Sequence, residues 1–239
     1  MTSAERGFWC VVPAAGRGRR FGGDRPKQHV EIAGKSLLGW TLERLASHPS
    51  IVGIVVVVAH DDASAGVETV FNGKRLLNVT GGEERADSVL AGLHGLPDSV
   101  ADSDFVLVHD AARPCVRHAD ISALIERGMA AGGALLASPL RDTLKRADAS
   151  GHVIETEPRE SRWRALTPQM FRRAELMAAL ESARDDGVIV SDEAMAMERA
   201  GFKPLLVEGS DDNIKLTTPA DRAFLEYLLK RKWGVGSGE

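Results

Sequence analysis

Short runs of apolar, often β-branched residues alternate along this chain with longer stretches of helical periodicity. The clearest runs span 8–13, 54–59 and 105–109 and are apolar on both faces, as in strands buried between two layers of helices. Weaker strand candidates lie at 134–139 and 204–208. Helices are expected at 37–47, 86–96, 119–131, 174–185, 192–200 and 219–230. The alternation predicts a doubly wound α/β fold with a mostly parallel sheet.

The composition limits the class of protein further. The chain has 239 residues, 44% of them hydrophobic, and we expect one domain over 1–239. Its net charge of −4 argues against a nucleic-acid partner. Cys10 and Cys115 lie far apart beside apolar runs and are expected to be free thiols. The longest strongly apolar run, 51–59, is too short to cross a bilayer and no signal peptide is recognisable, so we expect a cytoplasmic protein without a membrane partner.

The loop after the first expected strand is suited to phosphate. Ligands of doubly wound sheets bind at the carboxyl ends of strands, here after Pro13, Val79 and His109. Small residues allow backbone N–H groups to approach a triphosphate, and two basic side chains add positive charge. These residues are Ala14, Ala15, Gly16 and Gly18, followed by Arg20 and Lys27.

Two other glycine motifs fit this region poorly. A dinucleotide-binding turn needs glycine near the position of Phe21, and a P-loop ending at 33–36 needs glycine in place of His29. A flexible surface loop remains the alternative to a phosphate-binding loop.

Two further stretches carry candidate binding residues. The segment 81–88 (GGEERADS) follows a short strand; its glycines leave room for a base or a sugar and Ser88 can donate a hydrogen bond, although a turn with a helix cap explains it equally well. In VHDAARP, Asp110 ends a buried strand and is placed to hold Mg²⁺, and Arg113 is placed to bind phosphate. The alternative is a salt-bridged loop pair. His109 is interpreted as a packed strand-end histidine.

The segment 141–156 interrupts the alternation of strands and helices. It reads as two short alternating stretches around a turn, a hairpin with too little apolar surface to be stable alone. We therefore expect a β-arm over 141–160 that projects from the domain and packs on a partner subunit. Downstream, 211–215 offers carboxylates and an ammonium group after a strand, which would complete a phosphate and metal site or form a solvated turn.

Taken together, seven ordered motifs resemble one enzyme family, the 2-C-methyl-D-erythritol 4-phosphate cytidylyltransferases of the non-mevalonate isoprenoid pathway. The resemblance runs from about residue 8 to 230. The motifs are PAAGRGRRFGGDRPKQ, GGEERADSV, VHDAARP, RDTLKR, WRALTPQ, SDEA and DNIKLT.

The resemblance implies a Rossmann-like nucleotidyltransferase that joins CMP from CTP to methylerythritol phosphate, with Mg²⁺, as a homodimer joined by the β-arm. It implies that Arg20 and Lys27 stabilise the transition state and that Arg159 and Lys215 position the second substrate, Arg159 in the partner's site. The remaining implied roles are CTP binding by Pro13, Ala14, Ala15, Gly16, Gly18, Gly82 and Ser88, metal binding by Asp110, and second-substrate binding by Arg113, Thr143 and Thr167.

Three alternatives stay open at the level of sequence. A ribitol 5-phosphate cytidylyltransferase would share the CTP loop and differ in the second substrate's pocket. Phe21 disfavours an NAD-dependent dehydrogenase. A catalytically inactive nucleotide-binding regulator would be expected to lose Lys27 or Asp110, and both are present.

Overall fold

The computed structural model describes residues 7–16, 27–62 and 64–233, with the side chains of 27, 232 and 233 left out of the description. A central sheet has eight strands in the order β12-β8-β11-β7-β1-β4-β6-β5. These strands are β1 (Phe8–Pro13), β4 (Ile51–Val58), β5 (Glu68–Phe71), β6 (Lys74–Thr80), β7 (Phe105–Val108), β8 (Ala134–Pro139), β11 (Trp163–Arg172) and β12 (Leu205–Glu208). Six of the strands run in one direction, and β5 and β11 run the opposite way.

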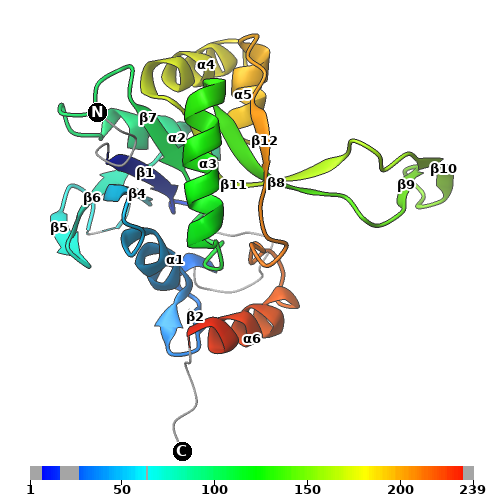
Figure 1. Ribbon diagram of the computed structural model, residues 1–239, viewed down its shortest axis with the longest axis horizontal. Coiled ribbons are helices and arrows are strands. Elements are labelled where there is room, and N and C mark those ends of the chain that lie inside the picture. The colour runs from blue at the N-terminus through cyan, green and yellow to red at the C-terminus, as the bar shows by residue number, and fades with distance from the viewer. Residues whose placement is uncertain (1–6, 17–26, 63, 234–239) are drawn as a thin grey trace, which may run out of the picture.

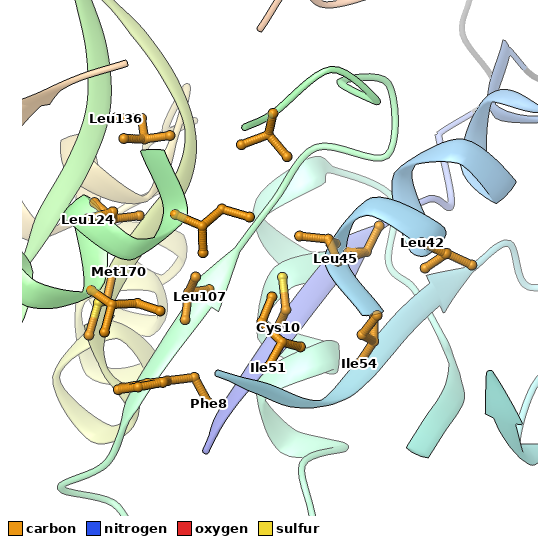
Figure 2. Packing of buried hydrophobic residues seen from close by; sticks show 14 of the residues in the cluster. Phe8, Cys10, Leu42, Leu45, Ile51, Ile54, Leu107, Leu124, Leu136 and Met170 are labelled. Atoms are coloured by element: carbon orange, nitrogen blue, oxygen red, sulfur yellow. The ribbon is translucent and has the colours of Figure 1, made fainter. Parts of the chain in front are cut away.

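Helices cover both faces of this sheet, as the apolar runs predict (Figure 1). They are α1 (Leu37–Ala46), α2 (Arg85–His94), α3 (His118–Ala131), α4 (Arg173–Asp185), α5 (Glu193–Arg199) and α6 (Asp221–Trp233). Alternate residues of β1 point to opposite faces: Cys10 and Val12 pack with α1 and α3, whereas Trp9 and Val11 pack with α2, α4 and α5. Figure 2 shows the first of these clusters, in which Cys10, Leu45 and Leu107 lie close together. The doubly wound α/β fold is confirmed.

Two details differ from the expectation. The sheet is mixed, because β11 lies antiparallel between β7 and β8. The last helix begins at Asp221 and not at Pro219. The Asp221 carboxylate accepts hydrogen bonds from the backbone N–H groups of Thr217 and Thr218, at 2.8 and 2.7 Å, so it satisfies donors at the start of the helix. A carboxylate at this end also interacts favourably with the helix dipole.

The segment expected to form an arm is a two-stranded hairpin that projects from the sheet (Figure 1). Its strands are β9 (Leu144–Ala147) and β10 (Val153–Glu157). Val153 and Ile154 are exposed within this chain, at 60% and 52%. A hairpin whose few apolar side chains face water has little to stabilise it by itself. A partner surface that covered these side chains would stabilise it.

Two short strands and the last helix enclose a third apolar cluster beside the sheet. The strands are β2 (Glu31–Ile32) and β3 (Lys35–Ser36), preceded by a single 3₁₀ turn, η2 (Lys27–His29). Ile32, Trp40, Leu225 and Leu229 are among its buried members. The cluster therefore fixes the segment that follows the first loop against the C-terminal helix.

The loop after β12, 209–215, contacts several distant parts of the chain, and we call it the connector loop. Asp211 accepts hydrogen bonds from Arg141 and Arg164, at the two ends of the arm. Asn213 donates its side-chain amide to the carbonyl oxygen of Thr167 at 2.7 Å. Lys215 pairs with Asp110. One short loop thus contacts both the base of the arm and the end of β7.

His48 is a buried histidine that follows α1 and contacts the half-buried His118 at the start of α3, and it makes stability depend on pH. His48 is 1% exposed and lies edge-on to His118, at 5.1 Å between ring centroids. Its Nδ1 accepts the Ser50 N–H at 3.2 Å, so Nε2 carries the proton and donates to Ser122 Oγ at 3.1 Å. Burial, and then the neighbouring His118, lower the pKa of His48 to about 4.

We expect the free energy of unfolding to fall as the pH drops from about 6.5 to about 4. Across this range the unfolded chain binds a proton at His48 and the folded chain does not, so stability rises with pH. The contribution is at most about 3 kcal/mol. Denaturant unfolding of wild type and His48→Gln at pH 7 and pH 5 measures it. The substitution should make the free energy of unfolding fall less between pH 7 and pH 5 than it does in wild type. An unchanged fall would assign the pH dependence to other groups.

Candidate active site

The candidate site lies where β1, β6 and β7 end, at one edge of the sheet. The backbone N–H of Ala14 donates to Val57 O and that of Gly81 donates to Val58 O, both at 2.8 Å. The loops after β1 and β6 therefore leave the sheet side by side, over the end of β4. Parallel strands bring their carboxyl ends to one edge, which is where ligands of such sheets bind.

The first part of the site is a close contact between small residues of two loops. A Cβ atom added at Gly81 would lie 2.7 Å from Ala15 Cβ and 2.8 Å from Ser88 Oγ, so a side chain at 81 would clash with both. Ser88 Oγ lies 3.5 Å from the Gly82 carbonyl oxygen. The structure thus brings Ala15, Gly82 and Ser88 together, and glycine at 81 is what allows the two loops to approach this closely.

The position of the first loop is fixed by a buried glutamine. Gln28 is 4% exposed and donates its side-chain amide to the Ala14 carbonyl oxygen at 2.6 Å. This bond ties η2 to the end of β1, where Pro13 is the last strand residue. Gly16 is exposed, and a Cβ added there would meet no atom within 4 Å, so the surface beside it is open. Gly18 and Arg20 lie outside the described residues, as does the side chain of Lys27.

The start of α2 also bears on the alternative interpretation of 81–88 as a helix cap. Asp87 Oδ2 accepts the backbone N–H of Glu84 at 3.2 Å, so Asp87 does act as a capping residue. Ser88 instead faces Gly82. The helix-cap interpretation therefore holds for Asp87, and nucleotide binding by Gly82 and Ser88 stays a prediction.

The second part of the site is a buried group of charges, the Asp110 cluster, with Asp110 at its centre. Asp110 Oδ1 accepts from Arg85 Nε and Nη2, at 3.2 and 3.1 Å. Its Oδ2 accepts from Arg113 Nε at 3.2 Å and from Lys215 Nζ at 2.9 Å. The fifth member is Glu193, which pairs with Arg85.

The charge state of Asp110 follows from these contacts. Burial alone would raise the pKa of its carboxyl, but Arg85, Lys215 and Arg113 together hold that pKa well below its usual range. Asp110 is therefore ionised at neutral pH. The cluster contains three cationic and two anionic side chains, so it carries a net charge of about +1 and is prepared to bind an anion.

The loop that holds Asp110 is supported by buried polar groups. Thr167 Oγ1 accepts the Asp110 N–H at 3.0 Å and is hydrogen-bonded to His109 Nδ1, also at 3.0 Å. His109 Nε2 is bonded to the Arg113 carbonyl oxygen at 2.9 Å. Burial lowers the pKa of His109 to about 4, so the ring is neutral and its role is to fix the loop. The Thr167 hydroxyl likewise bonds to this loop, whereas its carbonyl oxygen accepts from Asn213 of the connector loop.

The two remaining candidates, Thr143 and Arg159, lie on the arm and are exposed. Arg159 donates to the carbonyl oxygen of Arg141 at the base of the arm. Within the described part of the chain, neither residue is hydrogen-bonded or ion-paired to the Asp110 cluster. Any contribution they make to a substrate site is therefore expected in a partner's site, as the resemblance implies.

The sequence motifs did not lead to Arg85 and Glu193. Arg85 is the first residue of α2 and Glu193 the first of α5. Both lie inside stretches that carry the family resemblance, GGEERADSV and SDEA, so a signal was present. What the sequence did not indicate is that the two helix starts meet at the end of β7.

The carboxylates of this site could hold a cation such as Mg²⁺ only together with the phosphates of a bound substrate. Among the described residues there is no group of three or more histidine, cysteine, aspartate or glutamate side chains that could hold a metal ion. Asp110 offers carboxylate oxygens, which Mg²⁺ prefers, but both are paired with cations. Mg²⁺ is commonly held by one or two carboxylates plus substrate phosphates, and the residues fit that arrangement. None of the described helices is long and apolar enough to cross a membrane.

Comparisons with known proteins show the family of this chain. Residues 8–231 match the family model of 2-C-methyl-D-erythritol 4-phosphate cytidylyltransferase. Curated enzymes of that name from Xanthomonas oryzae and Stenotrophomonas maltophilia are each 55% identical, covering 94% and 95% of this chain and 83% and 98% of their own lengths.

Solved structures give the same result. A 4-diphosphocytidyl-2C-methyl-D-erythritol synthase superimposes with a TM-score of 0.80 at 36% identity, over 94% of this chain and 99% of its own. The Thermus thermophilus cytidylyltransferase gives 0.78 at 28% identity, over 94% and 99%. The chain thus belongs to the 2-C-methyl-D-erythritol 4-phosphate cytidylyltransferase family.

Proposed function

We propose that this chain transfers CMP from CTP to 2-C-methyl-D-erythritol 4-phosphate, which gives 4-diphosphocytidyl-2-C-methyl-D-erythritol and pyrophosphate. Family membership over 8–231 supports this activity. The structural observation that carries it is a cationic cluster around Asp110 at the same edge of the sheet as the closely packed loops at Gly81 and Ser88. A nucleotide bound by these loops and a phosphate on the cluster would lie at the same edge of the sheet.

The reaction is a single displacement at phosphorus. A phosphate oxygen of the second substrate attacks the α-phosphorus of CTP, and the bond from this phosphorus to the bridging oxygen of pyrophosphate breaks. The attacking phosphate oxygen is already anionic at neutral pH, so no strong general base is needed. Alignment and neutralisation of charge then supply most of the catalysis. The cationic residues available for this are Arg20, Lys27, Arg113, Arg159 and Lys215.

We assign the CTP side of the site to the loops after β1 and β6. Backbone groups of Pro13, Ala14, Ala15, Gly16, Gly18 and Gly82, with the Ser88 hydroxyl, would bind the base and the phosphates. Arg20 and Lys27 would stabilise the charge that develops at the α-phosphate. Cytosine should be preferred, because a mismatched base would leave polar groups of this site unpaired.

The second substrate is assigned to the Asp110 cluster. Arg113 and Lys215 both pair with Asp110 Oδ2, and an incoming phosphate would compete for these two cations. Arg113 is well suited to phosphate because its planar guanidinium presents two parallel donors. Thr143 and Arg159 would join this site from the arm of a partner subunit, so a homodimer is part of the proposal.

Mg²⁺ is the cation expected to act with CTP. Asp110 would supply a carboxylate ligand and the triphosphate oxygens most of the others. Once bound, the ion would neutralise negative charge on the phosphates. The cytoplasmic location expected from the sequence stays a prediction.

The test is release of pyrophosphate by the purified protein in the presence of Mg²⁺. Release is expected with CTP and methylerythritol phosphate together and not with either alone. UTP and ATP should be poor replacements for CTP. Ribitol 5-phosphate, the acceptor of the alternative enzyme that the comparisons do not favour, should also be poor. Equal efficiency with ribitol 5-phosphate would overturn the acceptor, and equal efficiency with UTP would overturn the base.

A further inference from the structure

Glu193 is the member of the Asp110 cluster that has been given no role so far, a buried carboxylate in apolar surroundings. It is fully buried, and its neighbours Ala194, Ala196 and Met197 pack into the second core cluster. A buried charge is strongly destabilising unless it is paired and hydrogen-bonded. Its oxygens Oε1 and Oε2 accept from Arg85 Nη1 and Nη2, at 2.5 and 3.2 Å. This two-point geometry is the strong form of an arginine–carboxylate pair.

The same guanidinium also contacts Asp110 by another edge. Nε and Nη2 of Arg85 both donate to Asp110 Oδ1, so one rigid plane lies between two carboxylates. The three residues come from different elements: Arg85 opens α2, Asp110 follows β7, and Glu193 opens α5. Because the guanidinium is planar, fixing it on Glu193 also fixes the orientation of the Asp110 carboxylate.

The two oxygens of Asp110 therefore have different kinds of partner. Oδ1 is bonded to Arg85, which Glu193 holds in place. Oδ2 is bonded to Arg113 and Lys215, which are the cations assigned to the incoming phosphate. When those two cations turn to the phosphate, Arg85 is the partner that keeps the Asp110 charge compensated. Glu193 meanwhile prevents Arg85 from leaving Asp110 for the same phosphate.

We infer that Glu193 and Arg85 are positioning residues for the polyol phosphate. Glu193 anchors Arg85, and Arg85 holds Asp110. Arg113 and Lys215 are then free to exchange their bonds to Asp110 for bonds to the phosphate. The inference rests on the proposed function, because it concerns the second substrate of that reaction. Neither residue needs to touch either substrate. Loss of the anchor should therefore change the acceptor's kinetic constants more than those of CTP, which Asp110 would affect only through Mg²⁺.

The first measurement is the steady-state kinetics of Glu193→Gln, which keeps the size of the side chain and removes its charge. We expect the KM for methylerythritol phosphate to rise roughly 10- to 100-fold, the range typical of residues that orient a directly acting group. The KM for CTP should rise clearly less than the KM for the acceptor, because the triphosphate oxygens would supply most of the Mg²⁺ ligands. Arg85→Lys should also have a raised KM for the acceptor, since one ammonium group cannot bond to both carboxylates as the arginine guanidinium does.

A double-mutant cycle shows whether Glu193 acts through Arg85. If it does, adding Glu193→Gln to Arg85→Gln should cause little further loss, because the anchored group is already gone. Asp192→Ala is the matched control. Asp192 caps the same helix by accepting the Met195 N–H at 3.0 Å and also accepts from the Gln169 amide at 2.9 Å, so this variant loosens α5 while the Glu193 carboxylate and Arg85 are kept. It should lower the melting temperature and leave the acceptor KM unchanged.

Several results would overturn the inference. One is an equal rise of KM for both substrates in Glu193→Gln; another is full additivity in the double variant; a third is an acceptor KM in Asp192→Ala as high as in Glu193→Gln. If Glu193→Gln does not fold, Glu193→Asp takes its place, because it keeps the charge but is too short to reach Arg85 with both oxygens. A wild-type protein that releases no pyrophosphate would instead overturn the proposed function, so the two failures are distinguishable.

Discussion

Replacing Lys27 with alanine is expected to lower kcat about 10²- to 10³-fold, because one preorganised charge on the transition state is lost. Lys27 opens η2, and the next residue, Gln28, is tied to Ala14 at the end of β1. Its backbone is thus anchored beside the loop assigned to CTP. The charge should act more on the departing pyrophosphate than on bound CTP, so kcat should fall more than KM rises. Arg20→Ala should behave in the same way.

Lys35→Ala is the matched control for this prediction. Lys35 lies in the same part of the chain but pairs with Glu43 on α1, and such half-exposed pairs contribute little. Its kcat should stay within about twofold of wild type. Steady-state release of pyrophosphate at several CTP concentrations measures both variants. A Lys27→Ala enzyme with a raised KM for CTP and an unchanged kcat would show that the assigned role is wrong.

Mixing two inactive variants, Lys27→Ala and Arg159→Ala, should restore up to about a quarter of wild-type activity. If the arm of one subunit completes the site of the other, each mixed dimer has one site with both lesions and one with neither. At equal mixing about half of the dimers are mixed and half of their sites are intact, which gives the quarter. The exposed position of Arg159, away from the Asp110 cluster of its own chain, is the structural reason to expect this.

The measurement needs proof that subunits exchange, for example with two tags on the two variants. Each variant alone, treated in the same way, is the control and should stay inactive. Arg159→Lys should remain poor, because the two-donor geometry for phosphate is lost. No recovery despite proven exchange would mean that each site is built within a single chain.

The sequence predicted the strands buried on both faces well, and β11 and the β5–β6 edge of the sheet less well. Strands β1 and β7 are covered by helices on both faces, so their residues are apolar without interruption. Strand β11 has no such pattern: its first residues are exposed beside the arm, Pro168 lies in its middle, and its pairing with β8 shifts between Ala165 and Gln169. The β5–β6 hairpin did have a signal, because Asn72 and Gly73 at its turn both have positive φ, as Asn-Gly turns do.

The candidate site was predicted in part for a similar reason. Asp110 and Arg113 follow a recognisable buried strand, and Lys215 lies in a marked charged stretch, so all three were named from sequence, and the structure brings them together. Arg85 and Glu193 meet only because α2 and α5 begin at the same edge of the sheet. That meeting depends on strand order and helix packing, which local patterns do not carry. The catalytic roles of the named residues stay predictions.

The connector loop has a consequence for anyone who wishes to redesign acceptor specificity. Its residues Asn213 and Lys215 contact Thr167 and Asp110, while Asp211, a few positions earlier, binds the arginines at the base of the arm. A library of lengthened or shortened loops would alter the pocket and the seating of the arm at the same time, so failures of either kind would look alike. Point substitutions at fixed loop length are therefore the safer route, and selection for new acceptors should screen oligomeric state in parallel.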